Sequence, residues 1–363
     1  MPFVWISIAA LLALLLSAWI SKRTFAKVIF VNLACAVLVI GGAETYYAID
    51  SGAQKGRSKV KIVDAGGRKA RMRKDDDILG YALVPDRTFV MSKWYDGDLI
   101  YEATYSIGAD GLRVPPPDRG GETIACTLFF GGSLTFGSGL DDDETLPYRV
   151  GMKTDGRYRI ISFSNRGYGP HQMLAAIEAG IVDKTIDCRP RYAIYQAITG
   201  HGMRVLGRAN WDRQGPRYEI EEQGIPVRRG NFDDPTDDLF GRRMRDRVFA
   251  GSFLYKELVA SRHSVEGLDL VAAIADRSRQ LIADKYPGTA FHVILRSSVA
   301  DGPGRSLHDR LRALGLSVHT EEDIFPDGAA DRLELRLSKD DGHPSALANE
   351  IVADYIVQRI VKD

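Results

Sequence analysis

The chain has 363 residues, of which 45% are hydrophobic, so it is long enough for one large globular domain with smaller additions. Its 48 basic and 48 acidic residues cancel, which argues against a general attraction to nucleic acid or to an acidic polymer. The 3 cysteines are too few for a disulfide framework and lack metal-ligand spacing, so we expect no metal site. Cys126 and Cys188 are either small core residues or a disulfide, if the domain lies outside the cytoplasm.

Two apolar runs without a charge open the chain, at residues 3–20 and 28–43. The first is about long enough to cross a bilayer as a helix, and the second reaches that length if it continues to residue 48. Basic residues follow the first run instead of preceding it, unlike in a secretory signal peptide. We therefore predict that residues 1–49 form two retained transmembrane helices, at about 3–20 and 28–48.

The orientation in the membrane depends on two conflicting clusters of basic residues. The link between the two runs carries Lys22, Arg23 and Lys27, while residues 50–77 form a second basic stretch that we expect to be a solvated juxtamembrane linker. Because the first helix usually dominates, we predict an inner (cytoplasmic) membrane protein with its large domain in the periplasm or outside the cell. The lipid bilayer is then one of its partners.

Residues 78–120 have short alternating segments rich in Tyr and Val, with turn signals at Asp96-Gly97 and Asp110-Gly111. This pattern is typical of strands joined by hairpins. We therefore predict a small β-rich subdomain that packs against the following domain.

Residues 121–363 alternate between apolar strand candidates and helical stretches, which indicates an α/β domain with a parallel sheet covered by helices on both faces. Residues 208–259 interrupt the alternation and are predicted to be an insertion at the rim, with a hairpin that turns at Gln223-Gly224. The predicted strands are residues 123–130, 158–164, 192–198 and 291–295, and the predicted helices are 145–153, 172–184, 268–285 and 346–362.

The first strand of this domain ends in the run Phe-Phe-Gly-Gly-Ser-Leu-Thr-Phe-Gly, in which the serine is Ser133. Two preceding glycines let the backbone turn sharply, so that the serine faces solvent at the carboxyl end of a buried strand. The run lacks the Gly-Lys-Ser/Thr ending of a nucleotide-binding loop. We therefore predict that Ser133 is a nucleophile rather than part of an ordinary glycine-rich turn.

A nucleophilic serine needs a base, and the base needs an orienting carboxylate. Near the end of the chain the run Asp-Asp-Gly-His supplies both, in the form of Asp340 and His343. A carboxylate three residues before a histidine can accept the imidazole Nδ1 proton and leave Nε2 facing the serine. Asp341 is adjacent and is the alternative carboxylate.

The two motifs, in this order, resemble the GDSL block and the terminal Asp-x-x-His block of the SGNH hydrolase (GDSL-type esterase) superfamily. The resemblance implies a flavodoxin-like three-layer α/β sandwich over residues 121–363, here with transmembrane helices and a β-rich accessory region added. It also implies an oxyanion hole made by the backbone N–H groups of Ser133 and of a glycine after the second strand, which matches Gly167. The family chemistry implies no cofactor.

Two departures from the family pattern stand out. The usual Asp of the GDSL block is Gly132, and the block that normally supplies an oxyanion-hole Asn contains none. Thr199 or His201 could donate a hydrogen bond to the oxyanion instead, and we name His201 as the candidate. Losing one such donor costs about 100- to 1000-fold in rate.

The sequence therefore predicts an ester hydrolase or acyl transferase that works through an acyl-enzyme, on an acylated small molecule or on the O-acyl groups of cell-envelope polysaccharide. The alternative is a non-catalytic carbohydrate-binding or scaffold protein that kept the fold while its oxyanion block changed. Arg113, Trp94 and Tyr168 could bind a sugar or an acyl group, although ordinary packing explains them equally well.

Overall fold

The computed structural model describes residues 2–55, 60–64, 72–117, 125–234, 252, 265, 267–300, 302–325 and 332–361. The chain divides into two compact units. The first contains Met1–Lys59 and Pro235–His263, and the second contains Val60–Asp234 and Ser264–Asp363.

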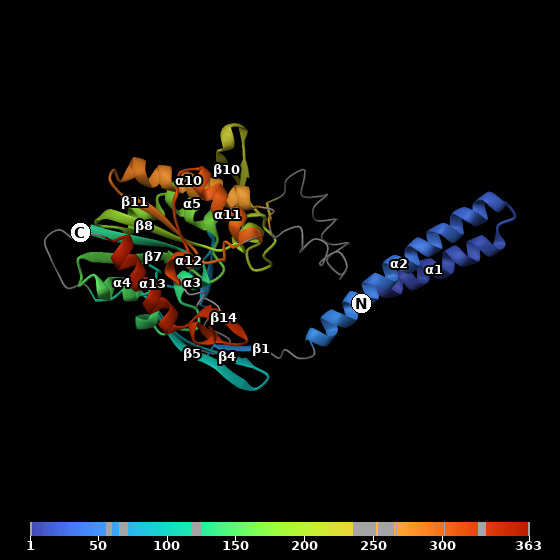
Figure 1. The fold of residues 1–363 in the computed structure, drawn as a ribbon, viewed down its shortest axis with the longest axis horizontal. Helices are drawn as coiled ribbons and strands as arrows, with labels where there is room; N and C mark the ends of the chain where they lie inside the picture. Colours follow the sequence, from blue (N-terminus) through green and yellow to red (C-terminus); the bar gives the residue numbers. More distant parts are fainter. Residues whose placement is uncertain are drawn as a thin grey trace. The chain divides into compact units, whose positions relative to one another are not determined.

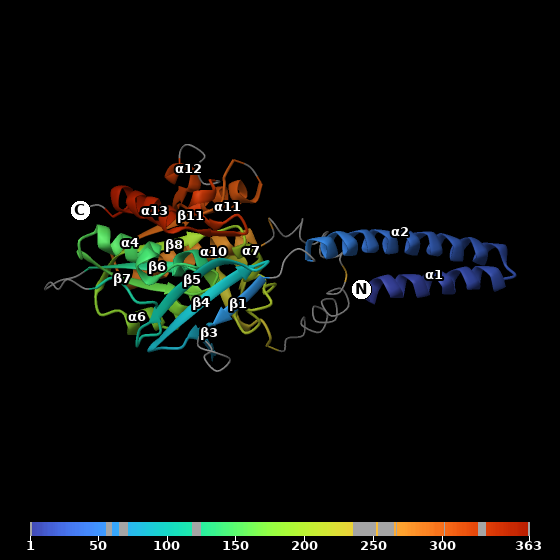
Figure 2. The same ribbon diagram turned by 90° about the horizontal axis from the view of Figure 1, so that it is seen from below.

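The first unit contains a hairpin of two helices, α1 (Pro2–Ile20) and α2 (Thr24–Lys55), which lie side by side (Figures 1 and 2). Small residues allow their close approach. A Cβ atom on Gly41 of α2 would come within 2.9 Å of the Ser7 Cβ atom of α1, and Ala34 is buried. Contacts between small residues are the usual way in which apolar helices pack without a polar seam.

One described helix, Thr24–Ile49, is long and apolar enough to cross a membrane, with a mean hydropathy of 2.2. The apolar part of α1, Val4–Ile20, forms a helix as predicted but is shorter. Large side chains on both helices are exposed, among them Trp19 at 80% and Phe25 at 78%. The sequence prediction of two spans is thus supported by length for the second helix, and the first span stays a prediction.

The second unit begins with a three-stranded antiparallel sheet in the order β1-β4-β5, which we call the accessory sheet. Its β4–β5 hairpin turns at Asp96 and Gly97, whose φ angles are +49° and +98°. Positive φ at both central residues is what a tight two-residue hairpin requires, so the turn predicted from sequence is confirmed. The strands are β1 (Val60–Asp64), β4 (Arg87–Tyr95) and β5 (Asp98–Ile107).

The stretch at residues 50–77 was predicted to be a solvated linker, and this prediction is wrong for much of its length. Helix α2 continues to Lys55, β1 joins the accessory sheet, and β2 (Arg73–Asp76) pairs with β3 (Gly80–Leu83). Strand β1 pairs with β4 through backbone hydrogen bonds, while its side chain Val60 remains 48% exposed. Its sequence therefore lacks the alternation of buried and exposed residues by which a strand is usually recognised. Arg73 is not solvated either, because its guanidinium lies over the ring of Tyr81 at 4.3 Å from the centroid.

The core of the second unit is a five-stranded parallel sheet in the order β12-β11-β8-β6-β7. In chain order this is the flavodoxin-like 2-1-3-4-5 arrangement, so the predicted fold class is confirmed. Ligands of such sheets bind beyond the carboxyl ends of the strands. The strands are β6 (Ala125–Gly131), β7 (Tyr158–Ser164), β8 (Arg189–Ala197), β11 (Ala290–Leu295) and β12 (Ser317–Thr320).

Helices cover both faces of this sheet, and the side chains of β6 show how. Leu128 and Phe130 pack in the cluster that includes α5, α10 and α11, whereas Phe129 packs with α4 and α13 on the other face. Successive side chains of a strand point to opposite faces, so one strand contributes to both layers of the core (Figure 1). The helices are α4 (Leu146–Lys153), α5 (Pro170–Glu178), α6 (Ile181–Thr185), α10 (Leu268–Lys285), α11 (Gly302–Ala313) and α13 (Ala346–Arg359).

Some elements differ from the sequence prediction. The helix expected at residues 172–184 is divided by Gly180, whose φ of +69° ends α5 before α6 begins. Helix α11 and strand β12 were not predicted, because β12 has only four residues, Ser-Val-His-Thr, and three of them are polar. Short strands give a weak hydrophobic pattern.

The predicted rim insertion is described only in part. Strands β9 (Pro216–Ile220) and β10 (Pro226–Asn231) form an antiparallel hairpin, and Gln223 and Gly224 at its turn have positive φ angles, as predicted. Apart from Ser252, residues 235–259 lie outside the described residues.

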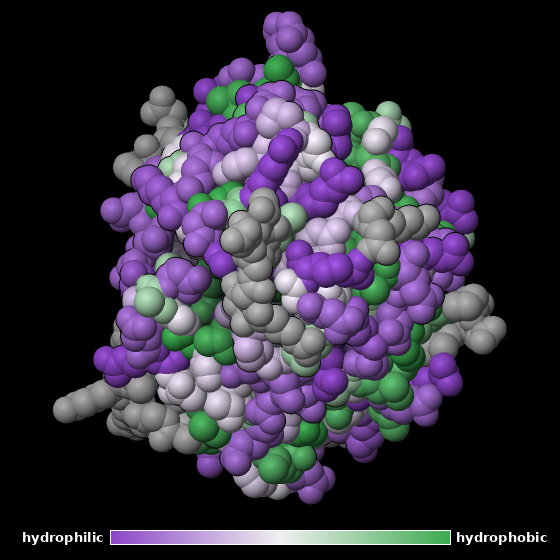
Figure 3. Space-filling model, turned by 90° about the vertical axis from the view of Figure 1, so that its left-hand side faces the viewer, coloured by the Kyte–Doolittle hydropathy of each residue, from purple (hydrophilic) through white to green (hydrophobic). Residues whose placement is uncertain are grey.

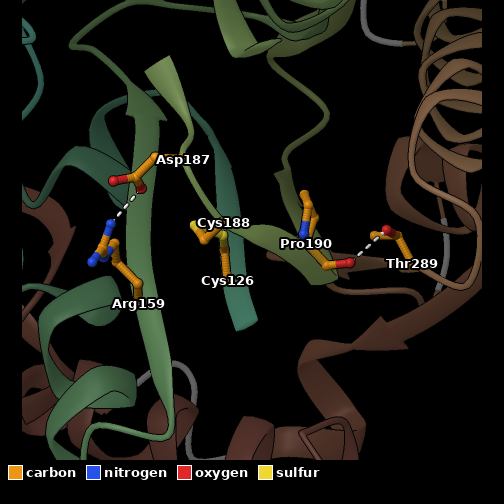
Figure 4. Close-up of a disulfide and its surroundings, with 6 residues drawn as sticks. All are labelled: Cys126, Arg159, Asp187, Cys188, Pro190 and Thr289. Carbon is orange, nitrogen blue, oxygen red and sulfur yellow. Dashed lines mark hydrogen bonds and ion pairs between the residues drawn. A yellow bond between two sulfur atoms is a disulfide. The ribbon is translucent and has the colours of Figure 1, made fainter. Parts of the chain in front are cut away.

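Cys126 and Cys188 form a disulfide between β6 and the residue just before β8 (Figure 4). Next to it, Thr289 Oγ1 donates a hydrogen bond to the Pro190 carbonyl oxygen at 2.7 Å. The bond lies near the amino ends of two neighbouring strands, at the opposite end of β6 from Ser133. The sequence left open whether these two cysteines are small core residues or a disulfide, and the structure contains the disulfide.

The surface of the second unit differs from that of the helical hairpin. The face of the molecule in Figure 3 is mostly hydrophilic, with hydrophobic residues in small separate patches. Large hydrophobic side chains that are exposed in this unit lie on different elements, such as Leu99 on β5, Met152 on α4 and Leu347 on α13. Scattered exposure of this kind is normal for a protein surface in water.

The disulfide is expected to stabilise the second unit through the unfolded state, since it closes a loop across a sequence separation of 62 residues. Loop-closure entropy then predicts that the double variant Cys126→Ala/Cys188→Ala loses about 4 kcal/mol of unfolding free energy. Urea unfolding of the full chain in detergent measures this. Dithiothreitol should lower the midpoint of the wild type and leave that of the double variant unchanged; equal midpoints for both proteins without reductant would contradict the prediction.

Candidate active site

Ser133 lies at the carboxyl end of β6, as the first residue of the short helix α3 (Ser133–Phe136). The two glycines before it are required by space. A Cβ atom on Gly131 would come within 2.1 Å of Thr135 Oγ1, and one on Gly132 would come within 2.8 Å of the Tyr168 carbonyl oxygen. Because Ser133 is the first residue of a helix, its own N–H has no acceptor within that helix.

His343 lies on strand β14 (Asp341–Pro344), which pairs with β13 (Arg336–Ser338) in a hairpin just before α13. Its Nε2 atom is 2.9 Å from Ser133 Oγ, although the two residues are 210 positions apart. This is the hydrogen-bond distance that a general base needs to accept the hydroxyl proton. The two residues singled out from sequence are thus brought together.

The carboxylate that holds the histidine belongs to Asp341, not to Asp340 as predicted. Asp341 Oδ1 is 2.6 Å from His343 Nδ1 and also accepts the backbone N–H of His343 at 3.0 Å. The Asp340 side chain instead lies 4.0 Å from Lys339 Nζ. The physical reason is that the segment is an extended strand, in which residues two apart share a face, whereas the prediction assumed a loop that curls back over three residues.

Lys93 from the accessory sheet contacts the same carboxylate. Its Nζ atom is 2.8 Å from Asp341 Oδ2, and the side chains of Lys93 and Asp341 are 18% and 3% exposed. Burial alone would raise the pKa of Asp341, but hydrogen bonds from His343 and Lys93 hold it well below its usual value. Asp341 therefore stays ionised. Nothing in the sequence of β4 marked Lys93, because its partner is 248 residues away.

Gly167 follows β7, which is the neighbour of β6 in the sheet, with Ser164 opposite Gly131. Its φ of +91° favours glycine, and a Cβ atom there would come within 2.5 Å of Trp211 Nε1. The indole N–H of Trp211 donates to the Gly167 carbonyl oxygen at 3.2 Å. The role of the Gly167 N–H as an oxyanion donor stays a prediction.

His201 begins the short helix α7 (His201–Val205) after β8 and is almost fully buried. Its Nδ1 is 2.6 Å from the hydroxyl of Tyr195. Burial lowers the pKa of His201 and raises that of Tyr195, so the imidazole is neutral and the phenol keeps its proton. The phenol therefore donates to Nδ1, which leaves the imidazole hydrogen on Nε2, 3.7 Å from where a Cβ atom of Gly132 would stand.

Arg204 was not predicted, yet it lies beside the same glycine. Its Nη1 atom is 2.7 Å from the point where a Cβ atom on Gly132 would stand, and it donates to the Tyr168 carbonyl oxygen. The steric reason for a glycine at this position is the Tyr168 carbonyl oxygen, a backbone atom, whereas the guanidinium of Arg204 is the flexible end of a side chain. Arg204 lies three residues after His201 on α7, so the two side chains share a face of the helix, and this spacing is the sequence signal that could have marked Arg204.

The other candidates have structural partners. Arg113 is buried and donates to the carbonyl oxygens of Phe136 at 2.6 Å and Gly137 at 2.8 Å, so it holds the loop after Ser133. The hydroxyl of Tyr168 donates to a backbone carbonyl within the core. The backbone N–H of Thr199 donates to a serine hydroxyl at 3.2 Å, and its side chain stays the alternative oxyanion donor.

A cavity of about 460 Å³ adjoins the Ser133–His343 pair, since residues next to both of them line it. Its lining combines charged and polar residues with apolar ones, including Leu134, Phe325 and Leu335. Arg296 binds Glu321 at 3.2 Å and lies over Phe325 at 5.3 Å, and its Nη1 is buried without a partner among the described residues. The cleft is therefore large enough for a small ligand and offers it an unpartnered guanidinium nitrogen.

Comparisons with known proteins found no matching family model and no curated relative. Among solved structures, similarity extends to a carbohydrate esterase of family 2 with a carbohydrate-binding domain, from Corynascus thermopiles (Myceliophthora fergusii). The two sequences are 12% identical, the match covers 84% of this chain and 88% of that one, and the TM-score is 0.35.

Two further solved structures are similar to the chain. A GDSL-like lipase from Parabacteroides merdae is 12% identical over 68% of this chain and 100% of that one, with a TM-score of 0.34. An acetyl xylan esterase from the rumen bacterium Butyrivibrio proteoclasticus is 9% identical over 74% of this chain and 68% of that one, with a TM-score of 0.33. A likeness of this size assigns no activity to the chain.

Two adjacent aspartates give a matched pair of variants. We expect Asp341→Asn to lower kcat for an ester by roughly 10⁴-fold, because the amide no longer holds the histidine in the correct tautomer. Asp340→Asn should change kcat by less than about 3-fold, since Asp340 does not contact His343. Steady-state hydrolysis by the two variants, with circular dichroism to compare folding, measures this. The reverse order of effects would restore Asp340 as the orienting carboxylate.

Lys93 should set the acid limit of activity. Replacing it by Met removes a positive charge next to the Asp341–His343 pair, which favours protonation of that pair. We expect the acid limb of the kcat/KM profile of Lys93→Met to move to higher pH by about one unit. Lys93→Arg keeps the charge and should keep the limb in place. If Lys93→Met lowers kcat/KM equally at every pH and leaves the acid limb in place, the role of Lys93 is packing only.

Proposed function

We propose that the protein is a membrane-anchored serine ester hydrolase, or an acyl transferase, that acts on O-acyl groups of carbohydrate through an acyl-enzyme. The observation that carries the proposal is the 2.9 Å separation between His343 Nε2 and Ser133 Oγ, with Asp341 on the other ring nitrogen. This connected arrangement of nucleophile, base and carboxylate suits acyl transfer.

In the first half of the reaction His343 Nε2 accepts the hydroxyl proton of Ser133 while Oγ attacks the ester carbonyl carbon. The imidazolium that forms is stabilised by Asp341, which stays ionised. The tetrahedral intermediate collapses when the bond to the alcohol oxygen breaks, and His343 gives its proton to the departing alkoxide. Water or a second alcohol then attacks the acyl carbon in the same way and frees Ser133.

The negative charge on the carbonyl oxygen needs donors. The N–H groups of Ser133 and Gly167 are two of them, and we assign the third to His201 Nε2, in place of the family's asparagine side chain. A neutral imidazole can donate here without becoming a competing base. The hydrogen bond from Tyr195 to Nδ1 supports the tautomer that this role requires.

The anchor in this proposal is the helical hairpin of α1 and α2. The length and hydropathy of Thr24–Ile49 support one span, and the exposed apolar side chains of α1 favour a second. The disulfide supports a location outside the cytoplasm for the second unit, because such bonds persist in oxidising compartments. An acylated cell-envelope polysaccharide would lie within reach of such an enzyme.

The test uses the full chain in detergent, since a fragment that starts at Asp75 would lose β1 and part of β2. We expect p-nitrophenyl acetate to be hydrolysed, and an organophosphonate probe to label Ser133 in mass spectrometry. Both signals should vanish in Ser133→Ala. A well-folded wild type with no turnover and no adduct would overturn the enzyme proposal and favour the non-catalytic carbohydrate-binding alternative.

A further inference from the structure

Trp211 is unusual among the exposed side chains of the second unit. It is 51% exposed, and it is the only aromatic residue among the large hydrophobic residues that are exposed in the described part of that unit. A tryptophan left in water without a ligand forgoes the burial of its large apolar surface. A ligand that covers this ring would bury that apolar surface.

The ring is exposed but firmly held. Its Nε1 donates to the Gly167 carbonyl oxygen at 3.2 Å. The next residue, Asp212, is fully buried and accepts hydrogen bonds from His171 Nε2 at 2.7 Å and Gln172 Nε2 at 2.9 Å. An aromatic ring that is fixed before binding loses little conformational freedom when a ligand contacts it, which favours affinity.

The ring also lies next to the reacting groups. Gly167, which holds its indole N–H, is the residue to which we assign one oxyanion donor. Arg204 lies 6.0 Å from the centre of the ring, and the same guanidinium approaches Gly132, directly before Ser133. Trp211 is thus linked to the surroundings of Ser133 through two shared neighbours, Gly167 and Arg204.

The chemistry around the ring fits a sugar better than a lipid. A pyranose has flat faces of C–H groups and a rim of hydroxyl groups, which match an indole face beside a guanidinium. A long acyl chain would need a continuous apolar groove, whereas the other exposed hydrophobic residues of this unit are scattered. We propose that Trp211 is the stacking platform for the sugar ring whose O-acyl group reacts at Ser133. This inference rests on the proposed function.

The first experiment compares two acetate esters of primary alcohols that differ in the alcohol, methyl 6-O-acetyl-glucopyranoside and propyl acetate, by acetic acid release in a pH-stat. We expect the full chain to prefer the pyranoside in kcat/KM. Trp211→Ala should reduce this preference about 10-fold, chiefly through KM, because one aromatic contact is lost. Trp211→Phe should retain most of it. An unchanged preference in Trp211→Ala would overturn the platform.

Trp94 was also a sugar-binding candidate from sequence, but its indole N–H donates to Ser92 on its own strand β4 rather than to Gly167, so it serves as a matched control. Trp94→Ala should leave the preference between the two esters as in the wild type. If Trp94→Ala lowers the preference as much as Trp211→Ala does, the effect is not specific to Trp211, and the proposal fails.

A binding measurement separates this inference from the proposed chemistry. Titration of Ser133→Ala with the acetylated pyranoside should change tryptophan fluorescence without turnover, and Ser133→Ala/Trp211→Phe should lose that change. If the wild type neither hydrolyses esters nor reacts with the phosphonate, but Ser133→Ala still gives the Trp211 signal, the proposed function fails and the sugar platform stands. The absence of a Trp211-dependent signal would reject the platform, whatever the activity.

Discussion

The carboxylate of Asp341 is the point at which the parts of the site meet. One of its oxygens accepts from His343 and the other binds Lys93, and the side chain is almost completely buried. A buried carboxylate is stable only when it is paired and hydrogen-bonded, so this group requires both partners. The hairpin of β13 and β14 and the accessory sheet therefore both contribute to holding His343 against Ser133.

Arg113 provides a second link between the accessory sheet and the segment that contains Ser133. It follows the sheet, and its guanidinium fills the turn after α3 with hydrogen bonds to the carbonyl oxygens of Phe136, Gly137 and Leu140. From the sheet itself, the Tyr105 hydroxyl accepts the N–H of Gly139 at 2.8 Å. The backbone beyond Ser133 is thus fixed from outside the α/β core. The accessory sheet is therefore a structural part of the candidate site, although it adds no strand to the parallel sheet.

The sequence allowed the α/β fold, Ser133 and His343 to be predicted because their signals are local. Alternating apolar strands and helices, two glycines before a serine, and a histidine before an amphipathic helix can each be read within a short window. The choice between Asp340 and Asp341 depended on whether residues 341–344 form a loop or a strand. Their partner strand, β13, has only three residues, so no sequence signal marked the pairing. Lys93 and Trp211 could not be found, since their significance arises from contacts with residues far away in the sequence.

Arg204 and His201 together set the electrostatics beside Gly132. With Gly132 in place of aspartate, no carboxylate stands between Arg204 and the backbone before Ser133, and the guanidinium approaches as a cation that burial makes less stable. Burial, with the positive charge of Arg204, keeps His201 neutral, and the hydrogen bond from Tyr195 leaves its one hydrogen on Nε2. Negative charge that develops on an acyl oxygen at Ser133 would relieve the cost of burying Arg204. The side of the site next to Gly132 therefore combines one buried cation, Arg204, with one neutral imidazole, His201.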